Sequence, residues 1–278
     1  MKLEALVPLV TYPEASSEKV ASNAVNIARH LGADLHALAL NVNIPDVSNA
    51  LSGLLLNLPE MIRAAEANSR VRGLALLAAV KAKAAEAGIA VTTSEIAAPP
   101  AEFGTVAALH ARYHDLSLIG WESNNPAGRM TAEGLVFGSG RPVVLLPESA
   151  DVGAIDRVMI AWDGSRVAAR ALADAQPFLQ RAEWISVVTV LDEKPIREKD
   201  IGERLAMTLQ QRGLAAEAVS INAEDCPIAE TLQAHALKIG AKLLVMGGYG
   251  HSRIRDFVLG GATEGVLSDL RLPVLLSH

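Results

Sequence analysis

Two places in the second half of the sequence carry residue types suited to holding a nucleotide. Asp163 follows the apolar run DRVMIAW, and the stretch VMGGYGHSRIRDFVLGGATEGVL leads from a predicted strand at Val245 into a predicted helix. A carboxylate at a strand end can accept hydrogen bonds from ribose hydroxyls, and a glycine-rich loop ahead of a helix offers backbone amides to phosphates. These residues predict such a site only if the fold brings them to one edge of a sheet.

Each feature also has a purely structural interpretation. The sequence WDGS is typical of a turn, in which Asp163 bonds to the local backbone and Ser165 is the N-cap of the next helix. The glycine-rich stretch can be a long surface connection whose glycines cap helices. Both interpretations stay open at this level.

Other motifs for catalysis or phosphate binding are absent from the sequence. There is no GxxxxGK[ST] loop, neither half leads from its first strand into GxGxxG, and no GxSxG, HExxH or CxxC motif occurs. The histidines, among them His110, His114, His235 and His251, lack the spacing of metal ligands. We expect them at surface or packing positions.

The elements that must position the candidate residues come in two similar halves. LEALVPLV from Leu3 and DRVMIAWD from Asp156 each open a series of apolar strands separated by helical patterns, in the same order. AEGLV and TEGVL align the halves near their ends, as do the strands RPVVLLP and LPVLLSH. Strands that alternate with helices predict βαβ units, and therefore parallel sheets covered by helices on both faces.

The predicted fold is α/β, with two tandem doubly wound domains that each hold a parallel five-stranded sheet. The boundary is expected between Glu148 and Gly153, which gives domains 1–149 and 150–278. One continuous sheet of ten strands is the alternative, and the matched halves favour two sheets. Ligands of such folds bind at the carboxyl ends of strands, beside the point where strand order reverses. Asp163 and the loop after Gly247 would then face one site.

Composition narrows the function classes. Half of the residues are apolar and 20% are charged, which is typical of a packed globular protein. The net charge of -6 and the pI near 5.7 leave no basic field for nucleic acid or an anionic membrane surface. Cys226 is the single cysteine, and the sequence shows neither a signal peptide nor an apolar run of about 20 residues. We therefore expect a cytoplasmic protein.

The spacing of the glycines resembles the motif of a known family. Gly247, Gly250 and Gly260, followed by the small Gly261, are similar to the G-x2-G-x9-G-[S/T] motif of the universal stress protein family. Asp163 closes the first strand as it does in that family. The resemblance covers essentially the whole chain, as a tandem member with two domains. It implies a Rossmann-like, adenine nucleotide alpha hydrolase-like fold that binds ATP, ADP or AMP, with Mg²⁺ as a candidate companion ion, and commonly without efficient catalysis.

The resemblance also implies roles for single residues. Asp163 would contact the adenosine part of the nucleotide, and Val190 at the end of a strand would line the adenine pocket. Loop amides would approach the ribose and phosphates at Gly247, Gly250, Gly260 and Gly261. Because the family motif usually has Ser or Thr at the position of Gly261, a hydroxyl donor is missing there. Ser252 or Thr263 would have to replace it.

The first half departs further from the family motif. Thr11 stands where the second half has its strand-end carboxylate, and the loop after Gly120 is shorter. The remaining motif glycines are replaced by Ser123, Arg129 and Met130. We expect the first half to bind no nucleotide.

An insertion over residues 43–66 further distinguishes the first half. Its LSGLLLNL piece is compatible with a mobile lid, an oligomer contact or an amphipathic helix packed on its own domain, of which the packed helix is favoured. Family members pair through their last strands, so the resemblance implies an internal pair of Val143–Leu146 with Pro273–Leu276. Formation of a homodimer stays open.

Three hypotheses for function follow. The first is a cytoplasmic stress-response protein that uses an adenine nucleotide in its second domain as a regulatory ligand. The second is a slow ATPase or nucleotidyl transferase, against which stand the missing Walker lysine and the lack of an obvious acidic pair for Mg²⁺. The third is a scaffold of two domains that bind no nucleotide.

Overall fold

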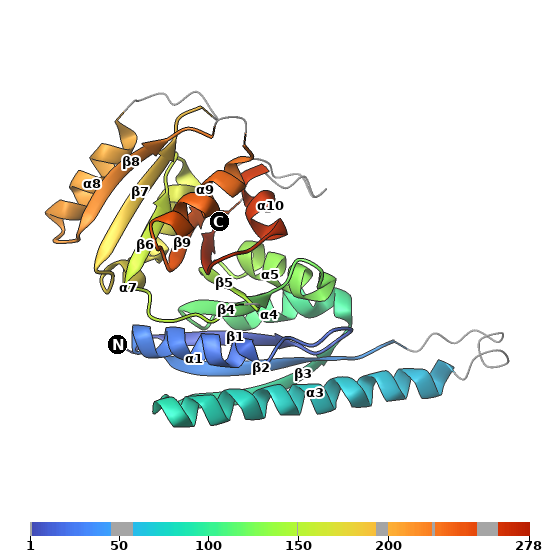
Figure 1. The fold of residues 1–278 in the computed structure, drawn as a ribbon. Helices are drawn as coiled ribbons and strands as arrows, with labels where there is room; N and C mark the ends of the chain where they lie inside the picture. Colours follow the sequence, from blue (N-terminus) through green and yellow to red (C-terminus); the bar gives the residue numbers. More distant parts are fainter. Residues whose placement is uncertain (1, 46–57, 149, 193–199, 224–225, 249–260) are drawn as a thin grey trace.

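A single twisted β-sheet runs through the protein, in a computed structural model that describes residues 2–45, 58–148, 150–192, 200–223, 226–248 and 261–278 (Figure 1). Its ten strands have the order β3-β2-β1-β4-β5-β10-β9-β6-β7-β8. In the first half these are β1 (Glu4–Val10), β2 (Asp34–Val42), β3 (Val91–Ala98), β4 (Leu116–Trp121) and β5 (Val143–Pro147). In the second half they are β6 (Arg157–Ala161), β7 (Trp184–Val190), β8 (Ala216–Ile221), β9 (Leu243–Gly247) and β10 (Val274–Ser277).

Helices cover both faces of this sheet. One face carries α1 (Lys19–Leu31), α3 (Leu58–Ala87), α6 (Arg166–Asp174), α7 (Gln176–Leu179) and α8 (Ile201–Gln211). The other carries α4 (Phe103–Ala111), preceded by a short 3-10 helix (Pro100–Glu102), with α5 (Pro126–Gly138), α9 (Ile228–Lys238) and α10 (Gly261–Ser268). The predicted doubly wound α/β class is therefore confirmed.

The two halves repeat one topology and are fused at the middle of the sheet. Within each half the strand pairs are parallel, with order 3-2-1-4-5 in the first and the matching order in the second. The last strands of the halves pair antiparallel, with Val274 opposite Leu145 and Leu276 opposite Val143. The expected pairing through the last strands is thus present within one chain. Because of it, the preference for two separate sheets was wrong, and the alternative of one ten-stranded sheet describes the molecule.

Local sequence explains where these elements begin and end. Strands β4 and β5 are buried along their whole length, and such continuous apolar runs are typical of parallel strands covered on both faces. Helix α1 ends at Gly32, whose φ of 66° is the left-handed conformation that glycine adopts readily. Helix α5 begins with the N-cap Asn125, whose side chain accepts a hydrogen bond from Gly128 N, and with Pro126 in its first turn.

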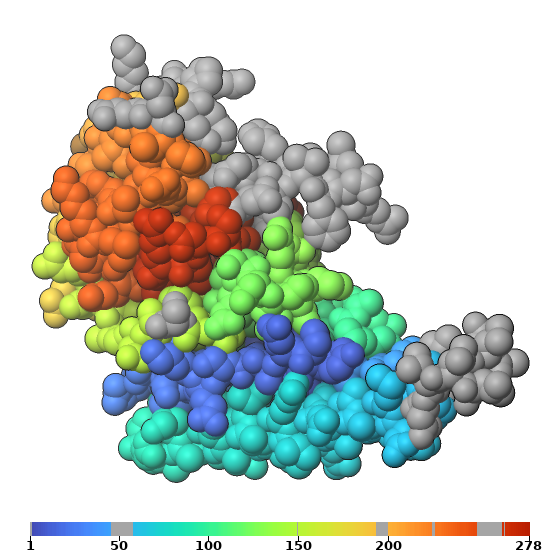
Figure 2. All heavy atoms as spheres, turned by 45° about the vertical axis from the view of Figure 1, so that its right-hand side comes forward, coloured from blue at the N-terminus to red at the C-terminus, as the bar shows by residue number. Residues whose placement is uncertain are grey.

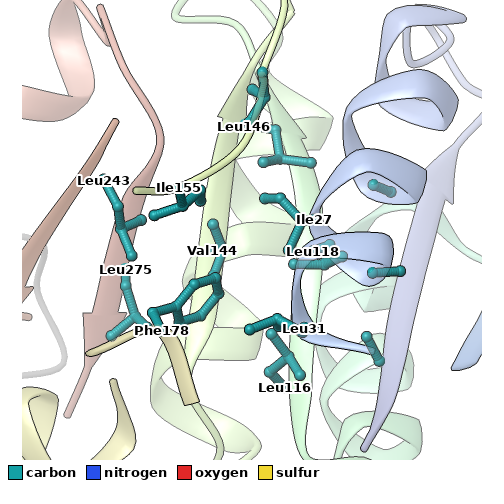
Figure 3. Packing of buried hydrophobic residues seen from close by; sticks show 14 of the residues in the cluster. Ile27, Leu31, Leu116, Leu118, Val144, Leu146, Ile155, Phe178, Leu243 and Leu275 are labelled. Atoms are coloured by element: carbon teal, nitrogen blue, oxygen red, sulfur yellow. The ribbon is translucent and has the colours of Figure 1, made fainter. Parts of the chain in front are cut away.

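The hydrophobic core is continuous across the junction of the halves. Figure 3 shows Phe178 and Ile155 of the second half in the same cluster as Val144 of β5 and Leu275 of β10. All four are at most 1% exposed. These residues belong to one hydrophobic cluster on the sheet face that carries α1, α6 and α7. The two halves therefore share a core as well as a sheet.

Polar contacts also join the halves. Trp121, the last residue of β4, is buried and donates its indole Nε1–H to the carbonyl of Leu267 in α10 at 2.8 Å. His278 Nδ1 lies 3.1 Å from Gly248 O, and its ring packs edge-on against Phe137 of α5, with centroids 5.0 Å apart. In Figure 2 the second half, in orange and red, rests on the first half, in green and blue.

Helix α3 lies along the outer side of the first half, and its N-terminal end reaches beyond the sheet (Figure 1). Its first buried residue is Ser69, eleven residues after its start at Leu58. The favoured interpretation of LSGLLLNL concerns residues 51–58 and falls, apart from Leu58, outside the described residues. Within the described ranges, no helix has the length and apolar character needed to cross a membrane.

Candidate functional site at the carboxyl ends of β6, β7 and β9

Strand β6 lies at the point where the strand order of the second half reverses. It pairs with β7 on one side and with β9 on the other, both in parallel. The carboxyl ends of the three strands therefore meet at one edge, where Asp163, Val190 and Gly247 follow or end them. This edge is where doubly wound sheets hold ligands.

Asp163 is exposed in the loop between β6 and α6. Its Oδ1 accepts a hydrogen bond from Ser165 N at 2.9 Å, across Gly164, whose φ is 71°. Ser165 in turn is the N-cap of α6, because its Oγ accepts a hydrogen bond from Ala168 N at 3.2 Å. The turn and the cap expected from WDGS are both present, and the carboxylate of Asp163 still faces solvent.

Val190 ends β7 next to this loop. Trp162 N donates to Val188 O at 2.8 Å, so the chain leaves β6 beside the end of β7. Val190 pairs with Ile221 of β8, is half-buried, and packs on the sheet face that α9 and α10 cover. The strand that carries Val190 thus ends next to the loop that carries Asp163.

Gly247 ends β9 directly under the first turn of α6. A Cβ at this position would lie 2.7 Å from both Ala168 N and the carbonyl carbon of Val167. Such contacts are closer than real Cβ atoms approach backbone, so packing alone requires glycine here. The next residue, Gly248, donates its N–H to Ser277 O at 2.8 Å.

The remaining predicted site residues are described only in part. Gly250, Ser252 and Gly260 lie outside the described residues. Gly261 is the first residue of α10, and Thr263 in the same helix is 5% exposed. Helix α10 packs closely on α9, because a Cβ on Gly265 would lie 2.5 Å from Ala229 Cβ.

A cavity beside Asp163 was not predicted from the sequence. It has a volume of about 280 Å³ and lies between the β6–α6 loop and α8. Its lining consists of Trp162, Gly164, Ile201, Arg204, Leu205 and Thr208. Trp162 could have been predicted as a lining residue because it precedes Asp163 in sequence. The α8 residues could not, because they are far from Asp163 in sequence and only the fold brings them to the cavity.

In the first half, the ends of β1 and β4 are filled by side chains of the chain itself, whereas a cavity of about 350 Å³ lies at the ends of β2 and β3, beside Asn41 and Ala97. Counted from the strand pairs with β4 and β9, Val10 and not Thr11 is the counterpart of Asp163. Thr11 is fully buried, and its Oγ1 lies 2.8 Å from Leu40 O and 2.6 Å from Ser69 Oγ of α3. These contacts close the end of β1 against α3.

Glu148, just after β5, fills the crevice between the start of α1 and the end of β4. Its Oε2 accepts a hydrogen bond from Ser17 N at 2.6 Å, and its Oε1 lies against the bare Cα of Gly120, the counterpart of Gly247. Burial raises the pKa of Glu148 to about 7, while the hydrogen bond from Ser17 opposes this shift and the charge of Glu122 adds to it. Sequence reasoning missed Glu148 because it stands in a polar stretch expected to be a boundary.

The described residues include side chains of the types that bind metal ions, and they include the single cysteine. Among them, no three His, Cys, Asp or Glu residues are grouped so that they could hold a metal ion. Cys226 is exposed and unpaired by a disulfide.

Comparisons with known proteins agree with this architecture. Over 98% of this chain and 95% of the other, the structure is similar to a universal stress protein from Archaeoglobus fulgidus, with a TM-score of 0.71 and 19% identity. A functionally unknown protein from Pseudomonas aeruginosa matches over 98% of this chain and 92% of its own length, with a TM-score of 0.55 and 16% identity. At these identities the likeness shows the fold. It covers both halves.

A universal stress protein solved in complex with cAMP is also similar to part of this chain. It is 18% identical and covers 52% of this chain and 98% of its own length, with a TM-score of 0.35. No curated protein matches the sequence. The sequence model of the universal stress protein family, however, matches residues 154–278, which begin just before β6 and include the edge described above. The match to the universal stress protein family is thus confined to the second half of the chain.

Proposed function

We propose that the second half binds an adenine nucleotide, ATP, ADP or AMP, as a regulatory ligand in a stress response. The ligand would lie at the carboxyl ends of β6, β7 and β9. The observation that carries the proposal is the overlap between the family match over residues 154–278 and the edge that holds Asp163, Val190 and Gly247.

The residues at this edge fit such a ligand. Asp163 is exposed and, among the described residues, Ser165 N is the donor bonded to its carboxylate, so the remaining lone pairs are free to accept ribose hydroxyls. Val190 offers an apolar surface suited to the face of a base. The chain after Gly248 leads into α10, and amides that precede a helix attract phosphates.

When bound, Mg²⁺ would neutralise phosphate charge. It is usually held by phosphate oxygens and water with one or two carboxylates, so it would arrive with the nucleotide. Regulation then requires only that the bound and free states differ in conformation or partner choice.

The test is calorimetric titration of the whole chain with ATP, ADP and AMP. We expect one site per chain, and we expect Asp163→Asn to weaken binding about tenfold, because a hydrogen bond to a charged group contributes about 1.5–3 kcal/mol. Glu217→Gln is the matched control, since Glu217 is an exposed carboxylate of the same half that lies in β8 near the opposite edge.

Other outcomes would sort the alternatives. Two sites per chain would contradict the assignment to the second half. The absence of binding, together with the absence of a co-purified nucleotide in native mass measurement, would favour the scaffold. ATP turnover of order 1 per second or faster, within the range of ordinary enzymes, would favour the enzyme.

A further inference from the structure

The junction between the halves is fastened to α1 by polar contacts. Asn23 Nδ2 donates to Ala150 O at 2.9 Å, and Asn23 Oδ1 accepts from Val152 N at 2.9 Å. Asn26 Nδ2 donates to Val152 O at 2.8 Å. Lys19 Nζ lies 3.2 Å from Asp151 Oδ1, on the exposed side of the same junction. The segment after β5 is therefore held against one helix of the first half.

Glu148 is the buried member of this attachment. Glu148 is 7% exposed, and its carboxylate lies in the crevice between the start of α1 and the end of β4. Helix α1 has Glu18 as N-cap residue, and the side chain of Glu18 makes no capping hydrogen bond. The carboxylate of Glu148 instead accepts from Ser17 N at this helix start.

The charges that face Glu148 do not neutralise it. Just after β4 comes Glu122, whose negative charge disfavours ionisation of Glu148. From α1 comes Lys19, but its ammonium is paired with Asp151 of the junction. From the start of α1 comes the single N–H of Ser17. Among the described residues, Ser17 N supplies the hydrogen bond to Glu148, so an ionised Glu148 is a buried charge that is costly without a paired cation.

We propose that Glu148 is a proton-controlled latch, which holds the junction on α1 when its carboxyl is protonated and loosens the junction when it is ionised. In the open state the carboxyl is in water and has its ordinary pKa of 4.5, whereas burial raises the pKa to about 7 in the closed state. The open state therefore loses its proton first as the pH rises. Opening becomes more favourable with rising pH and levels off above the pKa of the closed state.

The size of the effect follows from these two pKa values. Between pH 6 and pH 8, the equilibrium constant for opening should rise about tenfold. Most of this change is expected below pH 7, because the opening constant levels off once the closed form itself ionises. The latch therefore responds between the two pKa values, from mildly acidic to neutral pH.

Hydrogen exchange of the intact protein measures this opening. The probes are the amides of Ser17 and Val152, which are bonded to Glu148 and Asn23 only while the junction is closed. After correction for the intrinsic pH dependence of exchange, we expect opening at both amides to increase about tenfold from pH 6 to pH 8. In Glu148→Gln this increase should vanish.

Two further variants sharpen the test. Glu122→Gln should move the transition to lower pH, because it removes a charge that opposes ionisation of Glu148. Glu133→Gln, which changes a buried carboxylate paired with Arg129 away from the junction, should keep the wild-type pH dependence.

Carbon NMR titration of the Glu carboxyl groups in the unaltered protein is an independent measurement. One carboxyl that titrates near neutral pH, and that is missing in Glu148→Gln, is the expected result. The latch would be excluded if the exchange of Glu148→Gln kept the pH dependence of the wild type. It would also be excluded if every Glu of the unaltered protein titrated near the ordinary value.

Discussion

The carboxyl ends of β4 and β9 are equivalent places in the two halves, yet their surroundings differ. At β4, Gly120 faces the carboxylate of Glu148, and the end of β1 is tied to α3 through Thr11 and Ser69. At β9, Gly247 faces the backbone of α6, and Asp163 beside it is open to solvent. One topology therefore supports strand ends that are filled at β1 and β4 of the first half and open at β6 and β9 of the second, and the difference depends on a few side chains.

The largest expected effect tests whether Gly247 is required by packing. In Gly247→Val the Cβ would meet Ala168 N and Val167 C at 2.7 Å, and neither backbone atom can move cheaply. We expect the free energy of unfolding to fall by about 3 kcal/mol, as in overpacked cores. Urea unfolding measures the loss.

Gly248→Ala is the matched control for this substitution. Its nearest neighbours, Ser277 O and Val136 Cγ1, would be 3.4 Å from the added Cβ, which is an ordinary contact. A loss below about 1 kcal/mol is expected. Equal losses in the two variants would contradict a packing role specific to Gly247.

The second effect concerns the pH dependence of stability. The pKa of Glu148 is raised in the folded protein, from 4.5 to about 7, so the unfolded chain binds fewer protons between these values. The free energy of unfolding should therefore carry a contribution that is complete below pH 4.5, falls by about 3 kcal/mol as the pH rises to 7, and then levels off.

Glu148→Gln should lack this contribution. Urea unfolding at several pH values, compared between the two proteins, isolates it because all other groups are shared. Parallel curves for the two proteins would show that Glu148 titrates normally. This measurement reports on global unfolding, whereas hydrogen exchange at Ser17 and Val152 reports on the junction.

The smallest effect compares the starts of α6 and α1. Ser165→Ala removes the N-cap hydrogen bond to Ala168 N and should cost about 1 kcal/mol. Glu18→Ala should cost much less, because the Glu18 side chain makes no such bond. Urea unfolding at fixed pH compares the two, and a larger loss for Glu18→Ala would show that the caps were wrongly assigned.

Much of the fold could be predicted because its causes are local. Apolar runs such as those of β4 and β5 mark buried parallel strands, and the matched order of elements gives two doubly wound halves. The fusion into one sheet depends instead on an edge-to-edge contact between residues far apart in sequence. The family resemblance predicted that contact, whereas the residue pattern alone favoured separate sheets.

The candidate site could be predicted less fully. Strand order was enough to bring Asp163, Val190 and Gly247 to one edge. Gly247 must be glycine because the first turn of α6 lies directly against it. The closeness of α6 to β9 is a tertiary contact, and the sequence around Gly247 does not reveal it. Glu148 escaped prediction for a related reason, since a glutamate after a strand is usually exposed and only the crossing of α1 over the junction buries it.

The antiparallel pair of β5 and β10 has a consequence for the order in which the chain is made. Strand β5 is complete before any of β6 to β10 has been synthesised, and its VVLLP run then forms an open edge of a five-stranded sheet. An unpaired apolar edge is prone to join another chain. Its partner β10 is the last strand to be synthesised. Until then, the edge of β5 must not pair with the same edge of a neighbouring nascent chain.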